Sequence, residues 1–139
     1  ALTAAVFVAY ALLCLIELIV RRKTATQADV IRIVAVPLLC LLAVSILRNL
    51  IDRKRPYETG GIFPVIAKKK KGHSFPSRHV ASAFVIGMVL LPYCLWAGIA
   101  VLAAGALLGY IRFAAGIHYP SDLFAGAGIG VLFGLMVFI

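Results

Sequence analysis

The segment from Val80 to Ile111 constrains the fold strongly, because it contains 32 residues without Asp, Glu, Lys, Arg or His. One continuous helix of that length would extend about 48 Å, which exceeds the roughly 30 Å hydrocarbon core of a bilayer. Pro92-Tyr93 offers a break, and Tyr93 and Trp96 are aromatic residues of the kind found at membrane interfaces. We therefore expect two short membrane helices joined by a tight turn at Pro92.

Three further apolar runs have membrane-spanning length. With the two halves of the central segment they make five spans, and 63% of the 139 residues are hydrophobic, far above the share in a soluble domain. We predict an all-α integral membrane protein, a bundle of about five transmembrane helices that forms a single domain over residues 1–139. The sequence begins without Met and ends inside an apolar run, so we expect it to be part of a longer protein. The three runs are Leu2 to Val20, Val30 to Leu50 and Leu123 to Ile139.

Glycines recur at four-residue spacing in the last two predicted spans. Such spacing lets helices approach closely in lipid, although glycine is also frequent in membrane helices in general. The three cysteines lie within or beside apolar runs without a metal-binding spacing, and we interpret them as small core residues. The glycines are Gly105, Gly109, Gly126, Gly130 and Gly134, and the cysteines are Cys14, Cys40 and Cys94.

Polar residues gather in three stretches, Arg48 to Pro56, Lys71 to His79 and Arg112 to Asp122, which apolar runs separate. Because five spans alternate across the membrane, all three stretches fall on one face. The short connection 24–29 falls on the other face, with the Pro92 turn. We predict a functional site at the helix ends on the first face.

Arginines at separate positions indicate an oxyanion ligand, because a guanidinium group binds phosphate through two parallel hydrogen bonds. Ser77 and Arg78 open the third predicted helix, where free backbone N–H groups and the helix dipole also favour an anion. The acidic residues that can lie near this face are Asp52, Glu58 and Asp122, and they form no cluster that would hold a metal. We therefore expect no catalytic cation and no cofactor.

Without a cation, one histidine must supply the nucleophile and another must supply the proton. His118 and Asp122 lie four residues apart across the start of a helix. The carboxylate can therefore accept a hydrogen bond from one ring nitrogen and leave the other nitrogen free to attack. His79 is then the candidate acid for the leaving group.

The order and spacing of these residues resemble the type 2 phosphatidic acid phosphatase superfamily, which also contains the vanadium haloperoxidases. The family pattern is Lys-x6-Arg-Pro, then Pro-Ser-Gly-His, then Ser-Arg-x5-His-x3-Asp. This sequence has Arg48-x6-Arg55-Pro56, Pro76-Ser77-Arg78-His79 and Arg112-x5-His118-x3-Asp122, in that order. The resemblance covers residues 48–122, and the flanking spans fit the helical bundle of the family.

The resemblance implies a role for each matched residue. His118 would be the nucleophile that forms a phosphohistidine, Asp122 would orient it, and His79 would be the general acid. The implied phosphate ligands are Arg48, Arg55 and Arg112, with Ser77 and the Arg78 backbone as additional donors.

The sequence departs from the family pattern at three positions. Arg48 replaces the family lysine, which keeps the charge and alters the geometry of the phosphate contact. Arg78 replaces a glycine whose backbone N–H the family aims at the phosphate, and Ile111 replaces a serine. Family members commonly have six spans, so we expect one N-terminal span to be missing from this sequence.

The formal net charge of +9 admits nucleic acid or anionic lipid as a partner. Nucleic acid is disfavoured, because the basic residues lie between membrane-length apolar runs and no binding motif accompanies them. We predict that Arg53, Lys54 and Lys68 to Lys71 form a face that binds lipid head groups, with guidance of the substrate phosphate as the alternative. His73 matches no motif and is predicted to be a solvated loop residue.

These patterns favour an integral membrane lipid phosphatase that acts on phosphatidate, phosphatidylglycerophosphate or a polyprenyl diphosphate without a metal. A phosphotransferase that uses the same phosphohistidine is one alternative. A non-catalytic lipid-phosphate binder or transporter is another. The expected partners are the lipid substrate and the bilayer, and the oligomeric state stays open.

The side of the membrane on which the site lies is given differently by two arguments. Ten basic residues lie on the predicted site face and four on the other, so a positive-inside count puts the site in the cytoplasm. The family resemblance puts it outside. We expect a plasma membrane protein with an extracytoplasmic site, because most of the ten are accounted for by phosphate binding and long loops inform orientation less than short ones.

Overall fold

The computed structural model describes residues 27–59 and 72–139, and these ranges fold into helices joined by short turns. The predicted span Leu2 to Val20, Cys14 and the lysines from Lys68 to Lys71 lie outside the described residues. The elements are α2 (Gln27–Ile51), η1 (Pro56–Glu58), α3 (Arg78–Leu90), α4 (Leu95–Ala114), α5 (Pro120–Leu135) and η2 (Met136–Phe138), where η marks a 3-10 helix.

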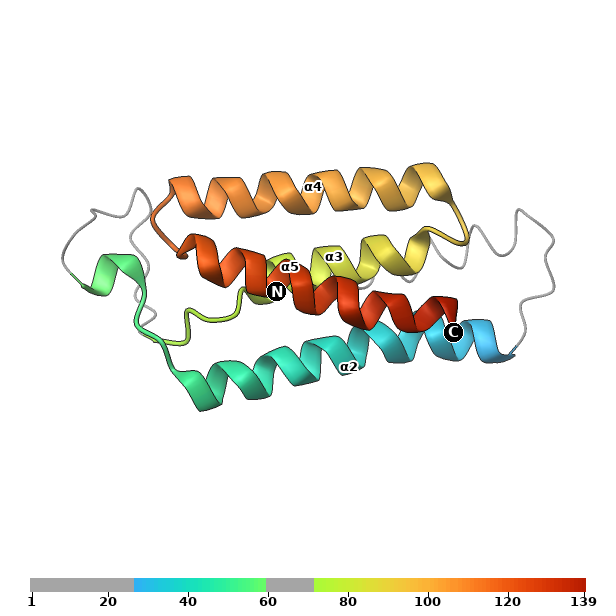
Figure 1. Cartoon of the computed structure of the whole chain (residues 1–139), viewed down its shortest axis with the longest axis horizontal. Helices are drawn as coiled ribbons and strands as arrows, with labels where there is room; N and C mark the ends of the chain where they lie inside the picture. Colours follow the sequence, from blue (N-terminus) through green and yellow to red (C-terminus); the bar gives the residue numbers. More distant parts are fainter. Residues whose placement is uncertain (1–26, 60–71) are drawn as a thin grey trace.

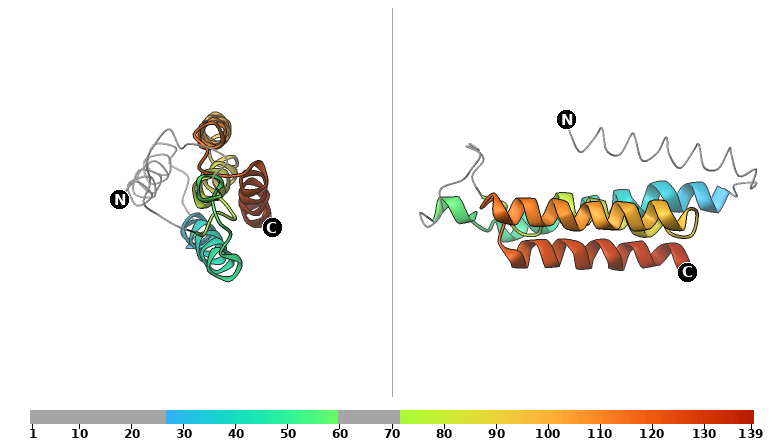
Figure 2. Two further views of the ribbon diagram at one scale, coloured as in Figure 1. Left: turned by 90° about the vertical axis from the view of Figure 1, so that its left-hand side faces the viewer. Right: turned by 90° about the horizontal axis from the view of Figure 1, so that it is seen from above.

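The four long helices within residues 27–59 and 72–139 alternate in direction along the chain. α2 and α4 end, and α3 and α5 begin, at the same end of the bundle (Figure 1). α3 lies in the middle and packs against α2, α4 and α5 (Figure 2). The core therefore forms where α2 and α5 meet the faces of α3. Its fully buried apolar side chains include Cys40, Val44, Val85 and Val89.

The outer faces of α2, α4 and α5 carry large apolar side chains that are exposed in the bundle. Such surfaces are unfavourable in water and suit a hydrocarbon solvent. Among the described residues, three helical segments are long and apolar enough to cross a membrane, namely Ile31–Glu58, Leu95–Ala114 and Pro120–Phe138. The chain is therefore an integral membrane protein. Exposed examples are Leu38, Leu42, Trp96, Leu107, Phe124 and Leu132.

The predicted break at Pro92 is confirmed, because α3 ends at Leu90 and α4 begins at Leu95. That the first half of this segment spans a bilayer stays a prediction. α3 has 13 residues and so extends only about 20 Å. It can be this short because neighbouring helices, rather than lipid, surround it. The total of five spans stays a prediction, since the described residues contain three candidate spans and the shorter α3.

The glycine spacing in α5 brings its backbone against α3. A Cβ atom at Gly126 would lie 2.7 Å from the carbonyl oxygen of Ser77, and one at Gly130 would lie 2.6 Å from that of Ala81. Both distances are too short for a contact between a Cβ atom and a carbonyl oxygen. At this separation of α3 and α5, both positions therefore require glycine. The predicted close helix approach is confirmed here, and it sets the beginning of α3 next to the beginning of α5.

The end of the bundle opposite the predicted site is joined by a side-chain contact. The Tyr93 hydroxyl donates to Asp29 Oδ1 over 3.3 Å, which links the turn before α4 to the first turn of α2. This confirms that the beginning of α2 and the Pro92 turn share a face. Cys40 is a buried core residue, as predicted, whereas Cys94 is half-buried at the start of α4.

Candidate active site

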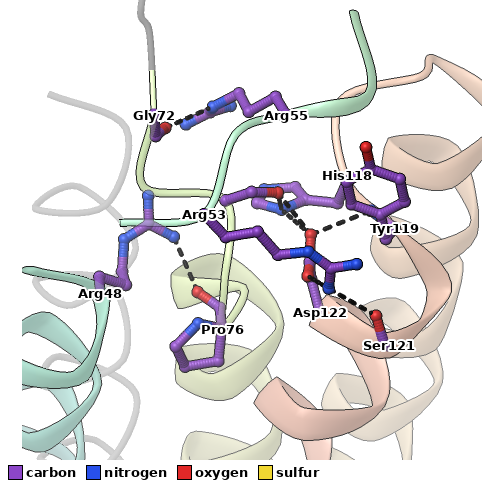
Figure 3. A network of polar contacts seen from close by, with 10 residues as sticks. Arg48, Arg53, Arg55, Gly72, Pro76, His118, Tyr119, Ser121 and Asp122 are labelled. Carbon is purple, nitrogen blue, oxygen red and sulfur yellow. Dashed lines mark hydrogen bonds and ion pairs between the residues drawn. The ribbon is translucent and has the colours of Figure 1, made fainter. Parts of the chain in front are cut away.

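The three polar stretches meet at one end of the bundle, as the alternation of spans predicted. Arg48 lies in the last turn of α2 and Arg112 in the last turn of α4. Ser77 is the N-cap of α3, and Asp122 lies in the first turn of α5. Figure 3 shows polar contacts at this end of the bundle, among them those of Arg48, Arg55 and Asp122.

Asp122 is fully buried and is the centre of the network. One oxygen, Oδ1, accepts from Arg53 Nη1 over 2.9 Å. The other, Oδ2, accepts from the Ser74 hydroxyl over 2.5 Å and from the Tyr119 backbone N–H over 3.0 Å, and it lies 3.5 Å from His118 Nδ1. A buried carboxylate with a guanidinium partner and several donors is held as an anion in one orientation.

The start of α5 is built to present this carboxylate. Gly116 has a φ of 66° in the turn after α4, a conformation that glycine adopts without strain. Tyr119 caps α5 and Pro120 follows in its first turn, where a missing N–H costs nothing. Asp122, three residues after the cap, folds back onto the Tyr119 N–H and satisfies a backbone donor at the helix start. Its own carbonyl accepts from the Ser77 N–H over 2.9 Å, which ties α5 to α3.

His118 is almost completely buried beside this carboxylate. Burial lowers the pKa of its imidazole, and the positive charges of Arg55 and Arg112 lower the pKa further, while the hydrogen bond with Asp122 acts in the opposite direction. The net direction is downward, so the ring is neutral at neutral pH. With Nδ1 facing Asp122, the nitrogen on the opposite edge of the ring, Nε2, is the one available for chemistry.

Two of the predicted phosphate ligands also organise the chain around the site. Arg48 Nη1 donates to the Pro76 carbonyl over 2.8 Å, and Arg55 Nε donates to the Gly72 carbonyl over 3.1 Å (Figure 3). Both arginines are buried. Each of these bonds uses one of five N–H donors of a guanidinium, so the segment before α3 is fixed while further donors remain for a ligand.

The site contains buried donors that find no partner within the described ranges. They are Arg78 Nε, Arg112 Nε and the hydroxyl of Ser77. Leaving a buried polar group unsatisfied costs about 1–3 kcal/mol, and more for a charged one. Arg48 also experiences the charges of Arg55, Arg78 and Arg112. An oxyanion would relieve both the unsatisfied donors and the repulsion between the arginines.

His79 lies in the first turn of α3 and is half-buried. This position puts it at the same end of the bundle as His118, which lies in the turn between α4 and α5. The structure therefore brings all eight predicted site residues to one end of the bundle. Side-chain contacts join His118 to Asp122 and Arg48 to the Pro76 carbonyl.

Two residues that were not predicted as site residues contact Asp122. Arg53 was predicted to be part of a face that binds lipid head groups, and the structure adds contacts that this prediction did not include: its guanidinium bonds to Asp122 and to the Ser121 hydroxyl and lies 4.2 Å above the Tyr119 ring. Ser74 had no predicted role, and its hydroxyl bonds to Asp122. The sequence offered only a weak indication of these roles: Arg53 lies two positions before the motif residue Arg55, and Ser74 lies two positions before the motif residue Pro76.

His73 is an exposed loop residue, as predicted, and it also makes contacts that the prediction did not include. Its Nδ1 lies 3.0 Å from the Arg48 carbonyl oxygen and its backbone N–H donates to Asp52 Oδ1 over 3.0 Å. His73 thus fixes the segment before α3 to the end of α2. Lys54 is exposed, in keeping with its predicted surface position.

The described residues contain no group of three or more His, Cys, Asp or Glu side chains that could hold a metal ion. Glu58 accepts from the Gly72 N–H over 2.7 Å, and Asp52 contacts His73. These two carboxylates therefore stabilise the loop, and metal independence stays a prediction.

Comparison with known proteins gives two curated relatives. The chain is 35% identical over 95 residues to the lipid A 4'-phosphatase of Bacteroides thetaiotaomicron, which is 62% of this chain and 41% of the relative. It is 30% identical over 117 residues to the bacitracin transport permease protein BcrC of Bacillus licheniformis, which is 84% of this chain and 58% of the relative. The chain thus spans about half the length of these relatives.

Two solved structures have a similar fold. The crystal structure of Aquifex aeolicus LpxE matches with a TM-score of 0.67 and 26% identity, covering 99% of this chain and 86% of that protein. The transmembrane PAP2 type phosphatidylglycerolphosphate phosphatase from Bacillus subtilis matches with a TM-score of 0.74 over 96% of this chain and 67% of that protein. At 21% identity the second likeness shows the fold alone.

The model of the PAP2 superfamily matches residues 29–139. This range includes the helix ends that carry Arg48, His79, His118 and Asp122. On this match, the chain belongs to the PAP2 superfamily.

Proposed function

We propose that the protein is a membrane lipid phosphatase that hydrolyses a phosphate monoester or diphosphate of a lipid through a phosphohistidine, without a metal. The observation that carries this proposal is the buried His118–Asp122 pair beside a cluster of arginines at the bundle end. A protein that only bound a lipid phosphate would need the arginines but no nucleophile. A neutral imidazole fixed by a buried carboxylate is the arrangement that nucleophilic catalysis requires.

The reaction takes place in two steps. His118 Nε2 attacks phosphorus, the N–P bond forms, the bond to the lipid oxygen breaks, and His79 donates a proton to the departing oxygen. A water molecule then attacks the phosphohistidine, His79 accepts a proton from that water, the N–P bond breaks, and inorganic phosphate is released. The imidazolium that forms on His118 in the first step is stabilised by Asp122 through Nδ1.

The arginines stabilise the charge that the phosphoryl group carries during both steps. Phosphoryl transfer spreads negative charge over three equatorial oxygens, and catalysis is mostly positioning and electrostatic stabilisation. Arg48, Arg55 and Arg112 supply fixed positive charge from three elements. The Ser77 hydroxyl and Arg78 at the start of α3 supply further donors.

Arg53 and Ser74 take part indirectly, as positioning residues. They hold the two oxygens of Asp122 on opposite sides, so the carboxylate keeps one orientation toward His118. This arrangement also keeps Asp122 ionised, which fixes the proton of the neutral imidazole on Nδ1.

A transporter is the second candidate, because one relative is named a transport permease protein. A phosphotransferase is a further variant of the first proposal, in which an acceptor other than water attacks the phosphohistidine. The substrate classes that fit are phosphatidate, phosphatidylglycerophosphate, a polyprenyl diphosphate and, from the name of the other relative, lipid A phosphate.

Release of inorganic phosphate by purified protein in detergent tests the proposal. The panel contains the four lipid classes and p-nitrophenyl phosphate, and each is measured with EDTA and with vanadate, a mimic of trigonal-bipyramidal phosphate. We expect turnover that persists in EDTA, is inhibited by vanadate and is abolished in His118→Ala. Transport of lipid phosphate into vesicles without phosphate release would support the transporter instead, and a strict requirement for added magnesium would exclude the mechanism.

We further propose that the site faces the extracytoplasmic side of the plasma membrane. A phosphate site needs its arginines on whichever side of the membrane it lies. These arginines therefore carry no information about orientation, and the positive-inside count that includes them is a weak argument for a cytoplasmic site.

A further inference from the structure

An apolar groove lies between α4 and α5, with α3 as its floor. Its volume is about 360 Å³, within the lower part of the range of small-molecule pockets, roughly 300–1,000 Å³. Its lining is almost entirely carbon. Lining residues include Val80 and Phe84 from α3, Gly109 and Phe113 from α4, and Leu123 and Ala127 from α5.

The groove exists because small residues face it. Gly109 has no side chain, and Ala106 and Ala127 have only a methyl group, so the space between the two outer helices is left open above α3. Gly109 is not required by close backbone contact, since a Cβ atom there would meet Val80 at an ordinary 3.5 Å. The small residues therefore leave space in the groove rather than permit close helix packing.

One end of the groove adjoins the candidate active site. Three of its lining residues directly follow site residues in the sequence: Val80 follows His79, Phe113 follows Arg112, and Leu123 follows Asp122. From there the groove extends along α4 from Phe113 to Ala106. Seven residues of helix correspond to about 10 Å, so the groove leads from the arginine cluster into the apolar part of the bundle.

We propose that this groove binds the hydrocarbon chain of the substrate, an alkyl or prenyl lipid whose phosphate lies among the arginines. The inference rests on the proposed function, and it adds where the hydrocarbon chain of the substrate lies. A phosphate bound at Arg112 and His118 would have its apolar chain beside it. The groove that begins next to these residues offers an apolar surface for that chain.

The groove orients the lipid chain and contributes little to the binding free energy. Lipid tails are as apolar as a leucine side chain, so moving a chain from the bilayer into the groove releases little hydrophobic free energy. A chain held beside the site restricts the ester oxygen to fewer orientations, which favours attack by His118. A bulky side chain in the groove should therefore impair long-chain substrates selectively.

Two variants fill the groove, and one matched variant does not. Ala106→Phe and Ala127→Phe place a ring in it. Ala104→Phe is the control, because Ala104 is exposed on α4 and lies two residues, about 200°, around the helix from Ala106. For each, kcat/KM is measured on a long-chain lipid phosphate in mixed micelles and on p-nitrophenyl phosphate.

We expect a loss of roughly tenfold or more on the long-chain substrate in both filling variants, with p-nitrophenyl phosphate within about twofold of wild type. Ala104→Phe should behave as wild type on both. An equal loss on both substrates, or no loss on either, would overturn the inference. Failure of the wild-type protein to hydrolyse either substrate would instead contradict the proposed function.

A measurement that does not depend on catalysis distinguishes failure of the groove inference from failure of the proposed function. A non-hydrolysable lipid phosphonate with a photoreactive diazirine in its chain is crosslinked to the wild-type protein, and the labelled peptides are identified by mass spectrometry. Labelling at Phe113 or Leu123 that disappears in Ala127→Phe supports the groove. Labelling confined to the outer face of α2, or to a second copy of the chain, refutes it.

Discussion

Arg53 Nη1 lies 2.9 Å from Asp122 Oδ1, and this ion pair joins the segment after α2 to the first turn of α5. The carboxylate is fully buried, and its other oxygen faces His118. Arg53 therefore acts on the candidate nucleophile through Asp122, at the side of the carboxylate opposite the imidazole. This relationship assigns Arg53 a positioning role that differs from direct phosphate binding.

Replacement of Arg53 should affect turnover more than substrate binding. Arg53→Gln removes a charged partner of a buried carboxylate, and we expect kcat to fall by roughly 10- to 100-fold with KM little changed. Arg53→Lys should recover part of the loss, because an ammonium keeps the charge without the planar fork. Steady-state kinetics on p-nitrophenyl phosphate provides the measurement.

Lys54→Gln is the control for Arg53, since Lys54 is the adjacent residue, carries the same charge and is exposed. It should leave kcat within about twofold of wild type. If Arg53→Gln raised KM and spared kcat, Arg53 would be a substrate ligand instead.

The two histidines should respond differently to the leaving group. His118→Ala should abolish turnover of every substrate, because the nucleophile is needed in each case. His79→Ala should reduce turnover of an alkyl phosphate by roughly 10²- to 10⁴-fold and should affect an aryl phosphate or a lipid diphosphate less, since their leaving groups are weakly basic. Equal losses on alkyl and aryl substrates would contradict the assignment of His79 as the acid.

The imidazole of His118 should resist protonation. Burial and the charges of Arg55 and Arg112 lower its pKa in the folded protein, so the ring should stay neutral as the pH falls through the range in which a solvated histidine becomes charged. ¹³C NMR of labelled histidine in detergent follows this, with His118→Gln to identify the signal. A His118 midpoint at or above the solvated value would show that the carboxylate outweighs burial.

The same shift links His118 to stability. Because the pKa is lower in the folded state than in the unfolded state, the unfolded state binds the proton more readily. His118 should therefore reduce the free energy of unfolding as the pH falls below its ordinary pKa, and His118→Gln should weaken that dependence.

Gly126 should be intolerant of a methyl group. A Cβ atom there would lie 2.7 Å from the Ser77 carbonyl oxygen, which is backbone and cannot rotate away. We expect Gly126→Ala to destabilise the protein by about 1–3 kcal/mol and to lower activity by moving the start of α5 from the start of α3. Thermal unfolding in detergent and phosphate release are the two measurements.

Gly128→Ala is the matched control on the same helix, since nothing lies within 4 Å of a Cβ atom at that position. It should be neutral, or stabilising by up to about 1 kcal/mol through helix propensity. Similar destabilisation by both changes would show that helix propensity, rather than contact with α3, decides the effect.

The orientation in the membrane can be tested with single cysteines. Thr59→Cys reports on the site end and Pro92→Cys on the opposite end, and both positions are exposed. In a background that lacks the three native cysteines, a membrane-impermeant thiol reagent on intact cells should label Thr59→Cys and spare Pro92→Cys. The reverse pattern would put the site in the cytoplasm.

The helix arrangement could be predicted from the sequence because the membrane restricts helices mainly in one direction, along its normal. The length of each apolar run, the proline at position 92 and the alternation of spans determine which polar stretches share a face. A short helix before Pro92 was predicted, whereas its end at Leu90 and its place among three other helices could not be predicted in this way. A helix surrounded by other helices is not required to match the bilayer thickness, and the run of apolar residues around Pro92 hides where it ends.

The motif residues could be located by spacing, whereas Arg53 and Ser74 could not. Both contact Asp122 from parts of the chain 69 and 48 residues away, and their positions depend on how the segments before α3 and after α2 fold. A charged residue beside Lys54 resembles an ordinary surface cation until the buried carboxylate that it faces is known.

The shortness of α3 determines how far substrate and water must travel. α3 has 13 residues and α4 has 20, so from their shared turn at Pro92 they extend about 20 Å and 30 Å. Ser77 and Arg78 therefore lie recessed by about 10 Å from the far end of α4. If α4 spans the roughly 30 Å hydrocarbon core, this recess places the start of α3 about 10 Å inside the boundary of the hydrocarbon. For the proposed reaction, water would then be the reactant that must move inward from the membrane surface.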